Sequence, residues 1–342
     1  MTETVSRRIT LASRPHGLPK PENFQISDVE LPRVADGEVL IRTIYLTLDP
    51  YMRGMMEDAE SYDDPIPLGG VIVGSTVSEV VESRDPSLAP GDIVESYVGW
   101  QSHAVVPAAH LRRIDPNLAP ITTALGVLGM PGLTAYHGLL KVGLPRSGET
   151  VFVSAASGAV GATVGQIARI KGCRVVGCAG SDEKVAYCLD DCGFDACINY
   201  KTCGDFEAAL REACSDGIDV NFENVGGPIS RAVMMQLNEH ARMAVCGTIS
   251  NYNATDAEMV PDNLWWFIVR RIRVEGLLVT DFAEHDEAAR AELASWIEDG
   301  RMIYRETIVD GFDNAPVAFN RLFEGSNFGK LIVAVGDDPT KG

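Results

Sequence analysis

The chain has 342 residues, of which 46% are hydrophobic and 23% are charged. This length allows two domains, and the composition is typical of a soluble globular protein. The formal net charge of −19 argues against a nucleic-acid-binding protein, because acidic surfaces repel phosphates. No segment has the pattern of a secretory leader or a membrane span, so we expect a cytoplasmic protein that contacts no membrane.

The first part of the chain, up to about Thr123, is predicted to be rich in β-strands. Apolar runs at 37–44 and 71–81 each read as a strand, and a Pro-Gly-Asp turn at 90–92 leads into another. Many short strands separated by glycine and proline predict a small barrel-like domain.

From Ala124 to about Gly300, short apolar runs alternate with helical patterns. The expected strands are 151–154, 174–178, 196–199, 220–223, 243–246 and 273–278, and helices are expected at 159–171, 230–236 and 288–298. This alternation predicts an α/β domain with a doubly wound parallel sheet. A last apolar run at 329–335 is expected to return to the first domain as a strand.

Residues 151–199 carry the clearest functional signal. They give, in order, a strand, a turn of small residues, a helix and a second strand, which is the unit that places a pyrophosphate at a helix N-terminus. The turn has Ala155, Gly158 and Gly161 where the usual pattern has three glycines. Gly158 would let the backbone approach a phosphate, and Gly161 would let the helix pack closely. An ordinary loop without a ligand is the alternative.

The end of the second strand favours NADP(H) over NAD(H). Proteins that bind NAD(H) usually place a carboxylate there, but residues 177–181 read GCAGS. Lys184 follows within one helical turn and could receive a 2′-phosphate. The alternative to this favoured role is a solvated helix residue. Asp182 and Glu183 weaken the NADP(H) interpretation unless the helix turns them outward.

The cysteines indicate neither a disulfide framework nor a metal site. All eight lie between Cys173 and Cys246, an uneven distribution that is unusual for an extracellular protein. Cys188 and Cys192 are spaced as on a helix, but no histidine is near and no C-x-x-C pair occurs. We therefore expect buried, reduced thiols.

Six segments resemble the medium-chain dehydrogenase/reductase superfamily. They read LDPYMRG at 48–54, GMPGLTAY at 129–136, GAVG at 158–161, GSDEK at 180–184, ENVGG at 223–227 and GSNFGK at 325–330. Within it, the chain is similar to the zinc-free prostaglandin/leukotriene reductase branch. RPHG at 14–17 and PENF at 21–24 are especially similar to bacterial NADPH-dependent curcumin reductases.

This resemblance covers nearly the whole chain and implies an organisation. It implies a Rossmann doubly wound parallel sheet over 126–309 and a β-rich GroES-like domain over 1–125 that is completed by 310–342. It also implies a homodimer. Zinc enzymes of the superfamily carry a Gly-His-Glu motif where residues 67–71 read PLGGV, so we expect no metal.

The resemblance also assigns individual residues. Gly158 to Gly161 would hold the pyrophosphate, and Lys184 and Tyr200 would hold the 2′-phosphate. The full set implied for NADP(H) is Gly158, Ala159, Val160, Gly161, Ser181, Lys184, Tyr200, Asn224, Cys246, Gly247, Thr248, Ile249, Tyr252, Leu277, Leu278, Val279 and Asn327. Within it, Asn224 would contact the ribose–nicotinamide side and Asn327 would close the pocket.

Two tyrosines are implied to face the substrate, and Tyr252 is the implied acid near its carbonyl oxygen. Taken alone, Tyr252 is a poor catalytic candidate, because a lone tyrosine is more often a packed aromatic residue. Tyr51, which follows Pro50, is as readily a structural part of a turn. Cys246 is expected to be a small strand-end residue rather than a nucleophile. The run WWFIV at 265–269 is expected to pack in the core, with a pocket wall or a dimer surface as alternatives.

The implied activity is NADPH-dependent reduction of the carbon–carbon double bond of an α,β-unsaturated carbonyl compound, an enone or enal. The alternatives are a quinone reductase on the same fold, an oxidase of hydroxylated lipids, and an NADPH-binding module without turnover. A fold by itself does not decide among them.

Overall fold

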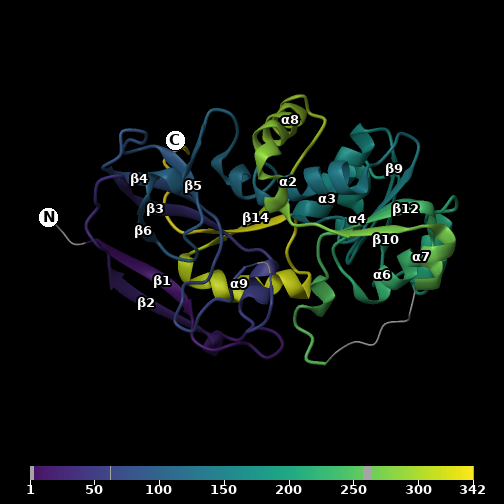
Figure 1. Cartoon of the computed structure of the whole chain (residues 1–342), viewed down its shortest axis with the longest axis horizontal. Helices are drawn as coiled ribbons and strands as arrows, with labels where there is room; N and C mark the ends of the chain where they lie inside the picture. Colours follow the sequence, from purple (N-terminus) through teal and green to yellow (C-terminus); the bar gives the residue numbers. More distant parts are fainter. Residues whose placement is uncertain (1–3, 62, 257–263, 342) are drawn as a thin grey trace. The chain divides into compact units, whose positions relative to one another are not determined.

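The computed structural model describes residues 4–61, 63–256 and 264–341. The chain divides into two compact units (Figure 1). Unit 1 comprises 1–125, 306–327 and 331–342, and unit 2 comprises 126–305 and 328–330. Unit 1 has antiparallel sheets and unit 2 a parallel sheet covered by helices, which confirms the predicted α/β class.

Unit 1 is organised around β3 (Glu38–Thr47), which is buried along nearly its whole length. It pairs with β4 (Thr76–Ser83), β6 (His103–Pro107) and the late strand β15 (Lys330–Ala334). The last run of the chain therefore returns to the first domain, as predicted. The other described elements of this unit are β1 (Val5–Leu11), β2 (Phe24–Glu30), α1 (Tyr51–Met55), β5 (Ile93–Ser96), β7 (Arg112–Ile114), β14 (Glu306–Asp310) and α9 (Ala315–Glu324).

The strand expected at 71–81 is shorter than predicted. It begins at Thr76, and Val71 forms only an isolated bridge with Thr10. Gly74 interrupts the run with a φ of +153°, and a Cβ there would come within 2.6 Å of the methyl group of Met52. A φ in this range favours glycine, and the regular strand begins two residues later.

Unit 2 contains a parallel sheet in the order β10-β9-β8-β11-β12-β13. The chain enters it in the middle at β8 (Thr150–Val153) and runs outward to β9 and β10, then crosses to β11 and runs outward the other way. The remaining strands are β9 (Arg174–Ala179), β10 (Ala196–Asn199), β11 (Ile218–Glu223), β12 (Leu237–Val245) and β13 (Arg273–Gly276). The direction of winding reverses between β8 and β11, which makes that point a topological switch point.

Helices cover both faces of this sheet. Helix α3 (Ala159–Ile170) packs on β8 and β9, while Phe152 of β8 points the other way into a core shared with α5 and α6. Figure 1 shows α3 and α6 on opposite sides of the strands. The other helices of this unit are α2 (Met130–His137), α4 (Asp182–Ala186), α5 (Phe206–Ala213), α6 (Gly227–Met234), α7 (Leu264–Arg270) and α8 (Asp286–Glu298).

The run at 265–269 does not lie wholly in the core, so that expectation is wrong for part of it. Trp265 is 67% exposed and Ile268 68% exposed on α7. Only one face of this short helix packs on β12, and Trp266 lies partly buried with the guanidinium of Arg270 4.5 Å from its ring centre. A helix at the edge of a domain buries one face and leaves the other in solvent.

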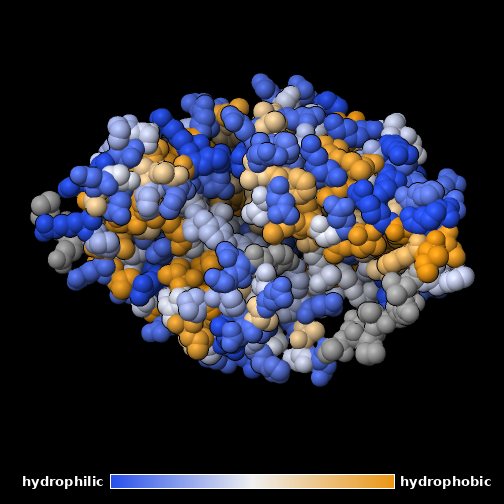
Figure 2. All heavy atoms as spheres, viewed as in Figure 1, coloured by the Kyte–Doolittle hydropathy of each residue, from blue (hydrophilic) through white to orange (hydrophobic). Residues whose placement is uncertain are grey.

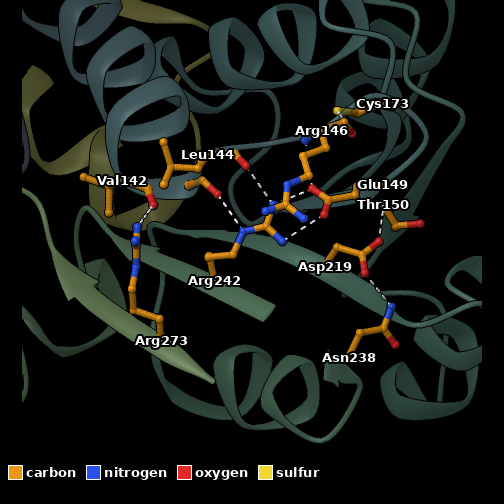
Figure 3. Close-up of polar contacts among 11 residues, drawn as sticks. Val142, Leu144, Arg146, Glu149, Thr150, Cys173, Asp219, Asn238, Arg242 and Arg273 are labelled. Carbon is orange, nitrogen blue, oxygen red and sulfur yellow. Dashed lines mark hydrogen bonds and ion pairs between the residues drawn. The ribbon is translucent and has the colours of Figure 1, made fainter. Parts of the chain in front are cut away.

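The amino edge of the parallel sheet is closed by polar side chains (Figure 3). Arg242 of β12 pairs with Glu149, just before β8, with 3.0 Å between Nη1 and Oε1. Arg242 also donates to the carbonyl oxygens of Gly143 and Leu144, at 3.0 and 2.8 Å. Burial opposes ionisation of Glu149, but the hydrogen bonds and charge of Arg242 hold the pKa of that carboxyl below its usual range. This network holds the ends of the strands together.

Candidate cofactor and active site

The residues of unit 2 that were assigned to the cofactor all follow the carboxyl ends of strands. On one side of the switch point, β8 is followed by Gly158 to Gly161, β9 by Ser181 and Lys184, and β10 by Tyr200. On the other side, β11 is followed by Asn224, β12 by Cys246 to Tyr252, and β13 by Leu277 to Val279. Because the strands are parallel, these ends lie along one edge of the sheet. Open parallel sheets bind ligands at this edge, at the switch point.

The turn after β8 has the shape that a pyrophosphate needs. Ala155 adopts a left-handed conformation with a φ of +51°, and Gly158 is the extended N-cap of α3. A Cβ at Gly161 would lie 2.3 Å from the carbonyl oxygen of Ala155, so only glycine fits there. The first turn of the helix thus packs closely on the loop and presents its backbone N–H groups at the edge of the sheet, where they can bind an anion.

Two lysines follow the ends of the neighbouring strands β9 and β10, and the charge of one acts on the other. Lys184 is half-buried, and burial, followed by the charge of Lys201, lowers the pKa of its ammonium group. A Cβ at Gly180 would lie 2.7 Å from the hydroxyl oxygen of Tyr200 and 3.3 Å from Cε of Lys201. The cluster has the charge and shape to receive a phosphate.

The acidic residues of α4 are engaged elsewhere. Asp182 accepts a hydrogen bond from the Asn199 side chain at 2.6 Å, and Glu183 pairs with Arg305 at 3.2 Å. Ser181 caps the helix by accepting from the Lys184 backbone N–H at 3.3 Å. The ion pair with Arg305 offsets the charge of Glu183, whereas Asp182 keeps its charge beside a neutral amide.

Sequence reasoning overlooked Lys201 in this cluster. Lys201 could have been found from its position next to Tyr200 in a chain with few lysines. Neighbouring residues just beyond the end of a strand can both reach the same edge of the sheet.

The turn after β11 supports the segment that follows β12. The carbonyl oxygen of Glu223 accepts from the N–H of Cys246 at 2.9 Å, and that of Asn224 accepts from Ile249 at 3.2 Å. The Asn224 side chain donates to the carbonyl oxygen of Ser154 at 2.8 Å. Backbone and side-chain bonds thus hold Asn224 and the loop 246–252 against the end of β8.

Tyr252 lies at the end of this loop, directly after the short 3₁₀ turn Ile249–Asn251. Its hydroxyl packs against Gly247, where a Cβ would come within 2.9 Å of it. Burial, followed by the charge of Glu223, raises the pKa of the Cys246 thiol to about 12. A protonated thiol is a poor nucleophile, so Cys246 is better suited to packing than to covalent chemistry.

The two remaining assigned residues belong to unit 1. Tyr51 opens α1, and its hydroxyl lies 2.8 Å from that of Tyr97, a partner that sequence reasoning missed. Burial raises the pKa of Tyr51 well above its ordinary value, so its phenol stays protonated. Asn327 follows α9. Roles for Tyr51 and Asn327 toward ligands stay predictions.

In residues 4–61, 63–256 and 264–341, no group of three or more His, Cys, Asp or Glu side chains is placed to hold a metal ion. Over the same residues, no helix combines the length and the apolar character that crossing a bilayer requires.

Comparison with known proteins identifies the family. Residues 7–114 match the model described as the N-terminal domain of oxidoreductase, and residues 159–296 match the one described as zinc-binding dehydrogenase. The chain is 46% identical to the NADPH-dependent curcumin reductase of Escherichia coli, covering 97% of this chain and 98% of that protein. It is 43% identical to prostaglandin reductase 1 of Rattus norvegicus, covering 95% and 97%.

The fold agrees with these relatives. The crystal structure of CurA in complex with NADPH from Vibrio vulnificus matches with a TM-score of 0.92 and 43% identity, covering 97% of this chain and 100% of that one. Identity at this level over nearly the full length confirms the resemblance seen in the sequence motifs. The chain belongs to the medium-chain dehydrogenase/reductase family, alongside the curcumin and prostaglandin reductases.

Proposed function

We propose that the protein is an NADPH-dependent reductase of the carbon–carbon double bond of α,β-unsaturated carbonyl compounds. The observation that carries this proposal is the carboxyl edge of the parallel sheet. There a helix N-terminus at Gly158, the lysine pair near Gly180 and the loop 246–252 follow strands of one sheet. The reductases to which the chain is similar support the reaction class.

The residues present fit NADP(H) better than NAD(H). A 2′-phosphate would meet Lys184, Lys201 and the hydroxyl of Tyr200 near the end of β9. The N–H groups of the first turn of α3 would bind the pyrophosphate. Asn224 and the loop 246–252 would hold the nicotinamide half.

When bound, NADPH supplies a hydride for the electron-poor β-carbon of the substrate. Negative charge then develops on the substrate's carbonyl oxygen. The hydroxyl of Tyr252 would donate a hydrogen bond to that oxygen and supply a proton toward the α-carbon. The hydroxyl of a tyrosine can donate such a hydrogen bond. We also propose that Tyr51 contacts the substrate.

The proposed reaction is tested by following NADPH absorbance with a panel of enones, enals and quinones, each assayed with NADPH and with NADH. We expect oxidation of NADPH by enones and enals, and products that keep the carbonyl group. Turnover of quinones alone would replace the proposal with a quinone reductase. Tight NADPH binding without any turnover would indicate a binding module.

We also propose a homodimer that forms through β13 and α7. All four residues of β13, the last strand of its sheet, are exposed, and Val274 is 42% exposed. Figure 2 shows hydrophobic side chains on the surface over α7, where Ile268 and Trp265 are exposed. A strand edge that has no partner among the described residues and lies beside apolar side chains is suited to pairing with a second copy.

The dimer is tested by light scattering on a sizing column. Ile268→Glu together with Val274→Lys should give a monomer, because charges would be buried in the interface. Val317→Glu is the matched control, since Val317 is also 68% exposed but lies on α9. A wild-type monomer would contradict the proposal.

The cytoplasmic location stays a prediction, which cell fractionation tests.

A further inference from the structure

Glu223, the last residue of β11, carries a carboxylate that is buried at the switch point of the parallel sheet. The residue is only 1% exposed. Its Oε1 accepts from the backbone N–H groups of Val225 and Gly226, at 2.8 and 2.9 Å, and from the hydroxyl of Ser154 at 3.0 Å. Its Oε2 accepts from the side-chain amide of Asn221 at 3.2 Å. Four donors compensate for the burial of this charge.

The two backbone donors belong to the turn on which the next loop rests. Gly226 has a φ of +78°, a value that favours glycine, so the turn has a defined shape. The carbonyl oxygen of Asn224 in this turn accepts from Ile249, and that of Val225 accepts from Ser250 at 3.0 Å. The carboxylate of Glu223 therefore holds the turn 224–226 in place. This turn then supports the loop that leads to Tyr252.

Ser154 connects the same carboxylate to the end of β8. Its hydroxyl donates to Glu223 and accepts from the backbone N–H of Asn224 at 2.8 Å. Its carbonyl oxygen accepts from the Asn224 side chain at 2.8 Å. A continuous chain of hydrogen bonds thus runs from Glu223 to the side chain of Asn224, across the point where the winding of the sheet reverses.

We propose that Glu223 is a positioning residue for the nicotinamide half of NADP(H). It acts through the turn 224–226, which orients Asn224 and carries the loop 246–252. It has no part in holding the adenosine half, which the turn after β8 and the lysine pair would bind. This inference rests on the proposed function, because it requires that NADP(H) bind along the carboxyl edge of the sheet.

The structure offers a conservative variant that separates geometry from charge. Oδ1 of Asn221 is buried and has no hydrogen-bond partner among the described residues. In Glu223→Gln, the new amide nitrogen can donate to this oxygen once the Asn221 amide rotates by half a turn, while the amide oxygen still accepts from Val225 and Gly226. Glu223→Gln should therefore restore what Glu223→Ala removes.

The test is calorimetric titration of each full-length variant with two ligands, NADPH and adenosine 2′,5′-bisphosphate, which lacks the nicotinamide half. For Glu223→Ala we expect NADPH to bind at least tenfold more weakly and the bisphosphate to bind within twofold of wild type. For Glu223→Gln we expect NADPH to bind within threefold of wild type. Glu149→Ala, at the amino edge of the same sheet, is the matched control and should bind both ligands normally.

The outcomes distinguish this inference from the proposed function. Equal losses for both ligands in Glu223→Ala would reduce Glu223 to a general structural role, and normal NADPH binding would also overturn the inference. If Glu223→Ala does not fold, Ser154→Ala, which cuts the same chain of bonds, must show the same selective loss for NADPH. A wild-type protein that does not bind NADPH would refute the proposed function itself.

Discussion

The two edges of the parallel sheet in unit 2 are built with different chemistry. At the amino edge, Arg242 and Glu149 satisfy each other's charge, and Asp219 accepts from the Asn238 side chain and the Thr150 backbone. At the carboxyl edge, glycines replace side chains, and two lysines lie close enough for one to lower the pKa of the other. Breaking a buried ion pair costs stability because one charge is left without its partner, whereas like charges held together favour an anionic ligand.

The largest effect should come from the amino edge. Arg242→Met removes the partner of a mostly buried carboxylate, so we expect a loss of about 3 kcal/mol in the free energy of unfolding. Urea denaturation followed by circular dichroism measures this. The folded variant should bind NADPH as wild type does. Weakened NADPH binding without loss of stability would show that the two edges do not have separate roles.

The next effect belongs to the carboxyl edge. Lys184→Ala should weaken NADPH binding by about 1.5–3 kcal/mol, the range for a hydrogen bond to a charged group. NADH binding should barely change, because NADH lacks the 2′-phosphate. Calorimetry with both cofactors provides the measurement. Equal losses for NADPH and NADH would reject the assignment of Lys184 to the 2′-phosphate.

Tyr252→Phe tests chemistry rather than binding at the same edge. Removal of the hydroxyl alone should lower kcat tenfold to a hundredfold, or about 1.4–2.7 kcal/mol, because water or a ribose hydroxyl can partly replace the donor. Direct titration should show nearly unchanged NADPH affinity. Full turnover of an enone by this variant would remove Tyr252 from the catalytic residues, and lost NADPH binding would make it a cofactor contact instead.

A smaller effect depends on pH. The pKa of the Glu149 carboxyl is lower in the folded state than in the unfolded chain. The stability that its charge contributes is therefore fully present above the ordinary pKa of about 4.3. This stability is lost as the pH falls through the pKa of the folded state. Glu149→Gln should cost about 1 kcal/mol at pH 7. The difference from wild type should shrink below about pH 4. A difference that stays constant from pH 7 to pH 3 would show that the charge of Glu149 contributes nothing.

Metal removal should have no effect on activity. The first part of the chain has PLGGV at 67–71 where zinc enzymes of the family carry a Gly-His-Glu motif. Activity should therefore persist in a strong chelator, and elemental analysis should find no stoichiometric zinc. Activity that tracks the zinc content would overturn this prediction.

Much of the parallel sheet could be predicted from the sequence. Strand β10 lies where it was expected, and β8, β9 and β13 agree to within two residues at each end. Apolar runs between turn residues mark such buried strands clearly. The strand expected at 243–246 begins earlier, at Leu237, because its first half carries polar residues that conceal the pattern. The exposed side of α7 was missed because an apolar run does not reveal what covers it.

The sequence by itself determined the order of the elements, the small-residue turn at 155–161 and the absence of a carboxylate after β9. These are local properties of backbone freedom and side-chain chemistry, and they point to NADP(H). Only the tertiary structure decided that Lys201 lies near Lys184 and that Glu223 joins the ends of β8 and β11 through Ser154. Such contacts join segments that are 17 and 69 residues apart in the sequence, and their distances are set by strand pairing and packing.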